Sequence, residues 1–116
     1  MEKKIIVQKL KKTSDSQITT AIRYYTILSI INDINLTERE IQLVAFTAVK
    51  GNISYPDIRE EFCTIYKSSS PTMNNMISKL KKFGILIKES GKIKVNSTIL
   101  LNFNHPIILQ ISLTHG

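Results

Sequence analysis

The segment from Ser68 to Asn96, SSSPTMNNMISKLKKFGILIKESGKIKVN, constrains the fold of this chain more than any other. Its first half predicts a helix: Ser70 is expected to cap it, with Pro71 at the first helical position, where proline fits well. Apolar residues then recur at helical spacing until Gly84, which supplies a stop. The residues expected to face inward are Met73, Met76, Ile77, Leu80 and Phe83.

The second half of the segment predicts a β-hairpin. Two short alternating stretches, Ile85–Lys88 and Lys92–Val95, lie on either side of the sequence ESGK. Alternation of apolar and polar residues is typical of a half-buried strand, and Ser-Gly is typical of a tight turn. A capped helix, a glycine and a hairpin therefore follow one another directly.

Three further helices are expected upstream. Apolar residues recur with the helical period over Gln17–Ile34. In NLTERE, Thr37 and Glu40 have the spacing of a capping box that starts a second helix, which Gly51 can end. The third helix begins near Pro56 in SYPDIREEFCTIYK, and its inner face is expected to hold Ile58, Phe62, Ile65 and Tyr66.

Helix, short helix, three-residue turn, amphipathic helix and hairpin, in this order, define a winged helix-turn-helix. We therefore expect a mainly α fold with a small β component (α+β), a winged-helix core with N-terminal and C-terminal strands added. The last helix resembles the recognition helix of MarR-like winged-helix proteins, and the match extends from about Leu36 to Asn96. Because one fold hosts many functions, the resemblance implies a fold more than an activity. The positions that carry it are Ser70, Thr72, Asn74, Asn75, Met76, Ile77, Leu80, Lys81, Lys82, Gly84 and Ile85.

The chain divides into a basic arm (1–13), a winged-helix domain (14–96) and an apolar extension (97–116). KKIIVQKLKK, in the arm, is typical of a strand, and residues 95–116 contain no Lys, Arg, Asp or Glu. An exposed apolar strand edge is an aggregation hazard, so it must be covered. Arm and extension pairing within one chain, or between neighbouring chains, would cover it, and both alternatives remain open. The residues expected at such an assembly interface are Ile5, Ile6, Val7, Leu10, Ile99, Leu101, Phe103, Ile107, Leu109 and Ile111.

The net charge of +7 is segregated along the sequence. Residues 1–12 carry +4, residues 13–69 carry −2 and residues 70–94 carry +5. A basic helix beside a basic hairpin is typical of nucleic-acid binding, although a lysine-rich helix face can also be a simple solvated surface. The candidate nucleic-acid-binding residues are Thr72, Asn74, Asn75, Ser78, Lys79, Lys81, Lys82, Lys88, Lys92 and Lys94.

The side-chain types in this set favour contacts to phosphates over contacts to bases. Asn74 or Asn75 can pair with adenine, and the lysines are suited to phosphates. Residues 68–96 contain no arginine, however, and arginine on guanine is the commonest base-specific contact. We therefore expect weak, salt-sensitive binding to the DNA backbone.

The sequence gives no sign of catalysis, a cofactor or a metal site. Cys63 is the single cysteine and is expected to be a small core residue, because free cysteine usually behaves as a buried hydrophobe. There is no glycine-rich phosphate loop, no HExxH motif and no nucleophile with a paired base. No apolar run is long enough for a membrane span, and lysines interrupt the apolar stretch that a signal peptide requires. We expect a non-enzymatic protein of the cytoplasm or of a virion.

A second resemblance bears on function. The stretches LTEREIQLVAF and SKLKKFGILIKESGKIKVNSTILLNF resemble short winged-helix proteins of crAss-like tailed phages. This resemblance implies a structural or assembly subunit of a phage particle, with protein neighbours in a homo-oligomer or ring and possible DNA backbone contacts. The alternative is a winged-helix transcriptional regulator, dimeric through its N-terminal helix and its extension.

Overall fold

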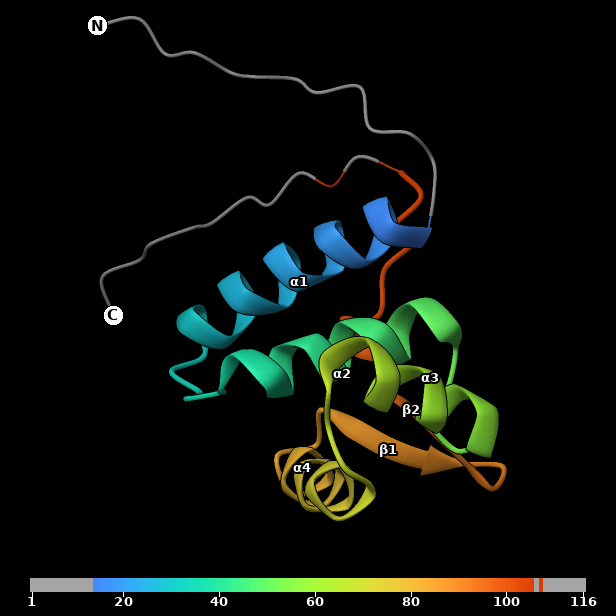
Figure 1. Ribbon diagram of the computed structural model, residues 1–116. Coiled ribbons are helices and arrows are strands. Elements are labelled where there is room, and N and C mark those ends of the chain that lie inside the picture. The colour runs from blue at the N-terminus through green and yellow to red at the C-terminus, as the bar shows by residue number, and fades with distance from the viewer. Residues whose placement is uncertain (1–13, 106, 108–116) are drawn as a thin grey trace, which may run out of the picture.

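The computed structural model describes residues 14–105 and 107, and shows four α-helices followed by a two-stranded antiparallel hairpin (Figure 1). This arrangement confirms the predicted α+β class and is compatible with a winged-helix layout. The strand expected in KKIIVQKLKK lies outside the described residues. The elements are α1 (Ser14–Ile31), α2 (Glu38–Lys50), α3 (Pro56–Tyr66), α4 (Ser70–Lys82), β1 (Leu86–Glu89), β2 (Lys92–Val95) and the 3-10 turn η1 (Ser97–Ile99).

Helix α2 begins and ends as its sequence predicts. The Thr37 hydroxyl accepts a hydrogen bond from the Glu40 backbone N–H at 3.1 Å, and the Thr37 N–H donates to the Glu40 carboxylate at 2.8 Å. These two bonds confirm the capping box. Gly51 ends the helix at φ 96°, a left-handed conformation that favours glycine.

The turn between α3 and α4 corrects the predicted cap of α4. Ser69, and not Ser70, is the N-cap, because its hydroxyl accepts the backbone N–H of Thr72 at 3.3 Å. A capping hydroxyl bonds the N–H two or three residues further on, and Ser69 stands at that distance from Thr72. Ser70 is the first helical residue, so the prediction was off by one position.

The core lies where α2 meets the other elements. Phe46 is fully buried on α2, and its ring centroid lies 5.4 Å from that of Phe62 on α3. Two residues expected to face inward are instead exposed, Ile65 at 52% and Phe83 at 51%. Ile65 lies on the exposed side of the short helix α3, which buries only Phe62 completely. Phe83 follows the last helical residue of α4, where the chain already turns toward β1.

The hairpin has the predicted turn, and its strand β2 is also hydrogen-bonded to the backbone of the α2–α3 connection. Ser90 and Gly91 both have positive φ, 52° and 76°, as the tightest hairpin turns require. β1 and β2 pair with Leu86 opposite Val95. The α2–α3 connection lies alongside β2, since the N–H of Ile53 donates to the carbonyl of Ile93 at 2.9 Å. The hairpin is thereby fixed to the helical part of the domain.

The beginning of the extension packs against α1 of its own chain. Phe103, a predicted assembly residue, is only 8% exposed, and its ring centroid lies 5.8 Å from those of both Tyr24 and Tyr25. The Tyr25 hydroxyl also donates to the Ile99 carbonyl at 2.8 Å. For Phe103 this packing favours the alternative in which the extension is covered within its own chain, because two tyrosine rings of α1 bury it.

The prediction of C-terminal strands is wrong for residues 97–105, which form a 3-10 turn and irregular structure instead. Asn96 explains the change of direction, because its side-chain carbonyl accepts the Thr98 N–H at 3.1 Å and caps the 3-10 turn. This local bond competes with a strand ladder, as Asn side chains often do. Of the remaining predicted interface residues, Ile5, Ile6, Val7, Leu10, Leu109 and Ile111 lie outside the described residues.

The contact between Tyr25 and the extension makes a prediction about alkaline stability. Tyr25→Phe is expected to lower the free energy of unfolding by about 1 kcal/mol at neutral pH, because it removes the hydrogen bond to Ile99. Burial, and then neighbouring Tyr24, raise the pKa of Tyr25 above the usual tyrosine value of 10.0. Below this value both the folded and the unfolded state keep the proton, and the full contribution is present.

As the pH rises above the usual tyrosine pKa, the unfolded state releases the proton that the folded state retains, so wild type loses stability that Tyr25→Phe does not lose. Urea unfolding at neutral and alkaline pH should show that the difference in free energy of unfolding between wild type and Tyr25→Phe decreases as the pH rises. Tyr55→Phe, which alters an exposed hydroxyl, is the control, and its difference from wild type should not change with pH. A difference that stays constant with pH would contradict the prediction.

Candidate nucleic-acid interface

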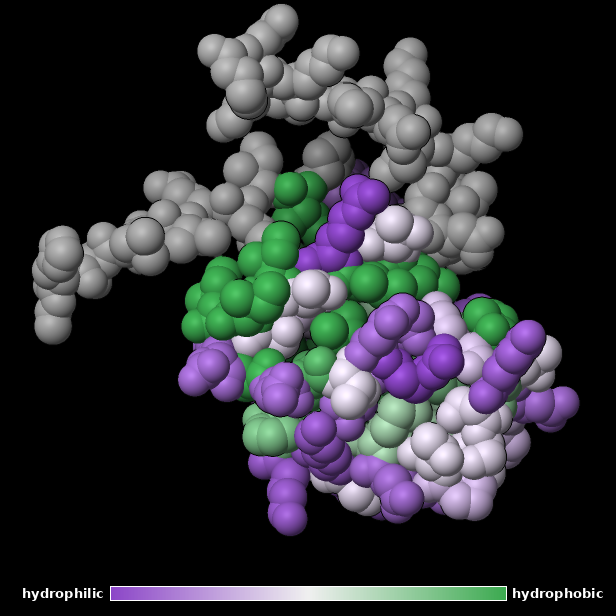
Figure 2. Space-filling model, turned by 60° about the vertical axis from the view of Figure 1, so that its left-hand side comes forward, coloured by the Kyte–Doolittle hydropathy of each residue, from purple (hydrophilic) through white to green (hydrophobic). Residues whose placement is uncertain are grey.

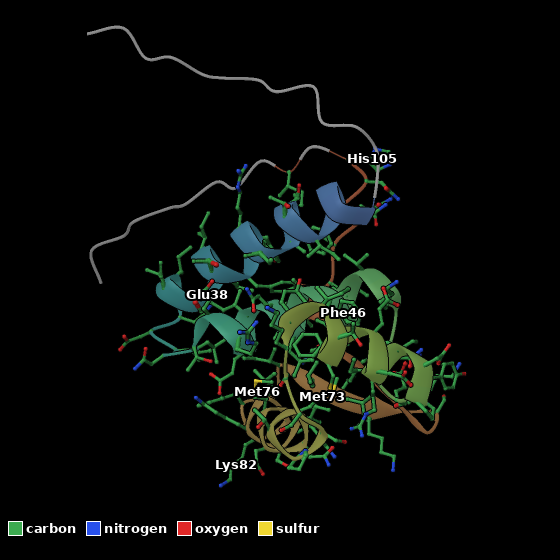
Figure 3. The ribbon with its side chains drawn as sticks, in the orientation of Figure 1. Glu38, Phe46, Met73, Met76, Lys82 and His105 are labelled. Atoms are coloured by element: carbon green, nitrogen blue, oxygen red, sulfur yellow. The ribbon has the colours of Figure 1, made fainter. Side chains whose placement is uncertain are left out.

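Four buried residues of α4 determine which way its other side chains point. Met73, Met76, Ile77 and Leu80 are buried against the core, so the opposite face of α4 lies in solvent (Figure 3). That face includes six of the ten predicted nucleic-acid-binding residues. They are Thr72, Asn74, Asn75, Ser78, Lys81 and Lys82, and all six are exposed.

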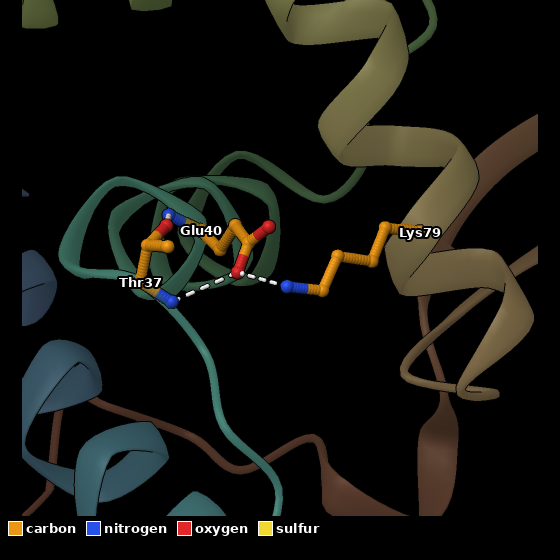
Figure 4. Close-up of polar contacts among 3 residues, drawn as sticks. All are labelled: Thr37, Glu40 and Lys79. Carbon is orange, nitrogen blue, oxygen red and sulfur yellow. Dashed lines mark hydrogen bonds and ion pairs between the residues drawn. The ribbon is translucent and has the colours of Figure 1, made fainter.

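Lys79 has a different environment from the other lysines of α4. Its ammonium lies 3.0 Å from the Glu40 carboxylate of α2, whose side chain is only 8% exposed (Figure 4). The same carboxylate oxygen accepts the Thr37 N–H of the capping box. Lys79 thus neutralises a buried acid and joins α4 to the start of α2, and it is not presented to solvent like Lys81 and Lys82.

The three lysines of the hairpin also differ from one another in their environments. Lys94 pairs with Glu89 at 3.5 Å across the hairpin. The ammonium of Lys92 lies 5.3 Å from the ring centroid of Tyr55, a cation–π distance. Lys88 is exposed on β1 and has no ion pair among the described residues. Charge on the hairpin is therefore partly compensated, and Lys88 and Lys92 provide its uncompensated part.

The α4 face contains no acidic side chain. Every charged residue between Ser70 and Lys82 is a lysine, whereas the acidic residues of the described chain lie on other elements. One of these, Glu61 of α3, pairs with Lys50 of α2 at 2.9 Å. A helix face with amide, hydroxyl and ammonium donors and no carboxylate is suited to a polyanion.

Tyr55 is a feature of this surface that sequence reasoning missed. It is exposed, and it precedes α3 in the loop that lies alongside β2. Its proximity to Lys92 depends on the backbone bonds between that loop and β2, which no local pattern predicts. An aromatic ring beside a lysine is a common feature of nucleic-acid surfaces, where bases stack on such rings.

A second surface lies where the end of α1 approaches the turn between α4 and β1. An apolar groove of about 200 Å³ opens there. Most of its polar groups already have partners within the chain: for example, the Ser29 hydroxyl donates to Thr26 O and the Asn96 amide to Gly84 O. Its lining residues include Tyr25, Leu28, Ile34, Leu36, Phe83 and Ile99.

An isoleucine ridge, Ile27, Ile30 and Ile31, lies on the outer side of α1 and does not line this groove. All three residues are exposed, and Ile30 is 72% exposed. Figure 2 turns this end of α1 toward the viewer and shows apolar side chains gathered on that face. Among the predicted assembly residues in the described part of the chain, Ile99 and Ile107 are half-buried against the core, and Leu101 is 40% exposed.

The described residues contain no group of three or more His, Cys, Asp or Glu side chains arranged to hold a metal ion. Within the same part of the chain, each helix is too short or too polar to cross a membrane. No family model, no curated protein and no solved structure matches this chain. The arrangement of its own side chains is therefore the basis for any functional proposal.

Proposed function

We propose that this protein binds nucleic acid through the exposed face of α4 and the adjoining hairpin, mainly by contacts to the phosphate backbone. The observation that carries the proposal is the acid-free face of α4, with Thr72, Asn75, Lys81 and Lys82 exposed together. The layout of helices and hairpin supports it, because a helix backed by a hairpin can enter a major groove while the hairpin contacts the flanking backbone.

The composition of the surface favours weak binding with little sequence preference. Lys79 is held by Glu40 and Lys94 by Glu89, which leaves Lys81, Lys82 and Lys88 for phosphates, assisted by Lys92. Asn74 and Asn75 are the side chains suited to adenine, and there is no arginine on α4 or the hairpin to read guanine.

The proposal is tested by the salt dependence of DNA binding. With three or four lysine–phosphate contacts, the logarithm of the association constant should fall with the logarithm of salt concentration at a slope of about −3 to −4. Lys81→Ala combined with Lys82→Ala should reduce that slope by about 2 and weaken low-salt binding by about tenfold or more. Fluorescence anisotropy with a labelled duplex of about 20 base pairs measures both quantities.

The matched control is Arg23→Ala combined with Lys50→Ala, which removes the same amount of positive charge from α1 and α2. It should leave the slope nearly unchanged, because neither residue belongs to α4 or to the hairpin. Equal losses in the two double variants would indicate a non-local charge effect. No binding by the wild type at low salt would exclude the proposed function.

A second candidate function is that of a non-enzymatic assembly subunit of a larger particle. The observation that favours it is the exposed isoleucine ridge on α1, which nucleic-acid binding does not explain. Co-purification with a particle at fixed stoichiometry would support this function. A protein that never sediments with other macromolecules in its native source would contradict it.

A further inference from the structure

The isoleucine ridge lies on a part of α1 that has no charge. From Thr26 to Asn32 the helix contains no Lys, Arg, Asp or Glu, and all three isoleucines of the ridge are exposed. A surface helix normally presents charged and polar residues to water, and its apolar residues face a neighbouring element. The ridge is therefore expected to have a cover, and the described residues do not provide one.

The chain turns back on itself beside the beginning of α1. The side chains of Gln17, in the first turn of α1, and Asn104 are hydrogen-bonded to each other. The N–H of His105 donates to the carbonyl of Asn102 at 3.3 Å, so a tight turn lies here, and Figure 3 shows His105 beside the beginning of α1. Beyond this turn, Ile107 is half-buried against the core. The chain thus reverses its direction and stays in contact with the domain.

Before this turn, the extension runs along α1 toward the beginning of that helix. Ile99 is bonded to Tyr25, and the residues after it reach the first turn of α1. A chain that reverses there returns toward the end of α1. Ile27 and Ile31 follow Tyr24 by three and seven positions, which places them on the side of α1 that the extension already contacts through Tyr24. The returning chain therefore runs toward these two residues of the ridge.

Residues 108–116, which lie outside the described residues, have the length and the pattern of a cover for the ridge. From Gln17 to Ile31, α1 rises about 21 Å. An extended chain from His105 to Leu113 spans up to about 26 Å, so it can reach the ridge. Successive side chains of an extended segment point to opposite sides, so one side of this segment is apolar and the other polar. The apolar side consists of Leu109, Ile111 and Leu113, and the polar side includes Gln110, Ser112 and Thr114.

We propose that residues 108–116 bind in extended form along the isoleucine ridge of their own chain, with their apolar side against Ile27 and Ile31. The basic arm is less suited to this place. Residues 1–12 carry +4, and the exposed Arg23 lies one helical turn before Ile27, with no acidic residue on this part of α1 to compensate. The bound segment removes the exposed ridge that favours an assembly function, and it leaves the face of α4 free.

The first test is a disulfide between the segment and the ridge in the full chain. Cys63→Ala removes the natural thiol, and Ile31→Cys with Leu113→Cys places one thiol on each surface. In a glutathione buffer the ratio of intrachain disulfide to reduced protein should be at least about tenfold higher than for Ile65→Cys with Leu113→Cys, because binding raises the effective concentration of the thiols. Ile65, on α3, is a matched control, since it is 52% exposed and Ile31 is 53% exposed.

Three outcomes of this experiment overturn the proposal. The first is an equal ratio for the two cysteine pairs. The second is a disulfide that joins two chains, which would mean that a second copy covers the ridge. The third is a higher ratio when Val7→Cys takes the place of Leu113→Cys, which would mean that the basic arm covers it.

The second test is protection of the segment from chymotrypsin. Ile31→Glu places a charge within the apolar contact, so it should accelerate cleavage after Leu109 and Leu113 at least about tenfold. Ile65→Glu should leave both rates within about twofold of wild type. Mass spectrometry measures each bond separately, and cleavage within α2 and α3 should stay unchanged, because Ile31 is exposed in the domain itself. Cleavage after Leu109 and Leu113 that is as fast in wild type as in Ile31→Glu would overturn the proposal.

Discussion

Phe103→Ala will lower the free energy of unfolding by about 3 kcal/mol, whereas Leu101→Ala, only two residues away, will change it by less than about 0.5 kcal/mol. The two residues share an apolar, uncharged sequence context but differ in environment. Phe103 is 8% exposed and packs against the rings of Tyr24 and Tyr25. Leu101 is 40% exposed, so its truncation removes little buried area.

Urea unfolding followed by far-ultraviolet circular dichroism measures both values. The same experiment distinguishes the packing seen here from the assembly role that the sequence first indicates for Phe103. If Phe103 bound a neighbouring chain, its replacement would weaken association and leave the stability of the monomer intact. Equal effects of Phe103→Ala and Leu101→Ala on monomer stability would contradict the packing of Phe103 against Tyr24 and Tyr25.

The features that sequence predicted well depend on neighbours in the chain. The Thr37–Glu40 capping box needs two residues three positions apart, and the hairpin turn needs Ser90 and Gly91 between two alternating stretches. The exposed face of α4 follows from helical phase once Met73 and its apolar companions are assigned to the core. Geometry of this kind is encoded within a few residues, so a local pattern suffices.

The features that sequence missed depend on residues far apart in the chain. Lys79 was grouped with Lys81 and Lys82 because the three share a helix, yet its partner Glu40 lies 39 positions earlier. Phe103 was grouped with Leu101 because no sequence pattern shows which side of the extension meets α1. The cap at Ser69 was missed because three consecutive serines offer nearly equivalent hydroxyls, and only the hydrogen bond to Thr72 distinguishes them.

The structure therefore gives the predicted lysines of the candidate site different environments. Removing Lys79 and Lys94 from the set of available charges lowers the number of expected phosphate contacts, and with it the predicted salt slope. A variant that removes Lys79 together with Lys81 and Lys82 would confound loss of binding with loss of stability. Replacing only Lys81 and Lys82 therefore tests DNA binding without removing the ion pair to Glu40.

Glu40→Ala will lower the free energy of unfolding by about 2 kcal/mol, the second-largest effect expected. One part, about 1 kcal/mol, is the reciprocal half of the capping box, because the Thr37 N–H loses its acceptor. The other part, also about 1 kcal/mol, is the ion pair with Lys79, a value reduced by the 39% exposure of the lysine side chain.

Lys79→Met separates these two parts, because it keeps the aliphatic stem and removes only the charge. It should cost about 1 kcal/mol, and the double variant Glu40→Ala, Lys79→Met should cost less than the sum of the single variants, since each removes the same ion pair. Urea unfolding of the four proteins gives this coupling energy. Strictly additive costs would contradict the ion pair.

DNA binding by the folded Lys79→Met protein provides the functional contrast. Because its ammonium is held by Glu40, loss of Lys79 should change the salt slope by much less than 1, whereas loss of Lys81 alone should change it by about 1. If Lys79→Met and Lys81→Ala reduce the slope equally, then Lys79 leaves Glu40 to contact phosphate. In that case binding would be coupled to breaking the contact between α2 and α4, and Glu40→Gln, which releases the lysine, should strengthen binding.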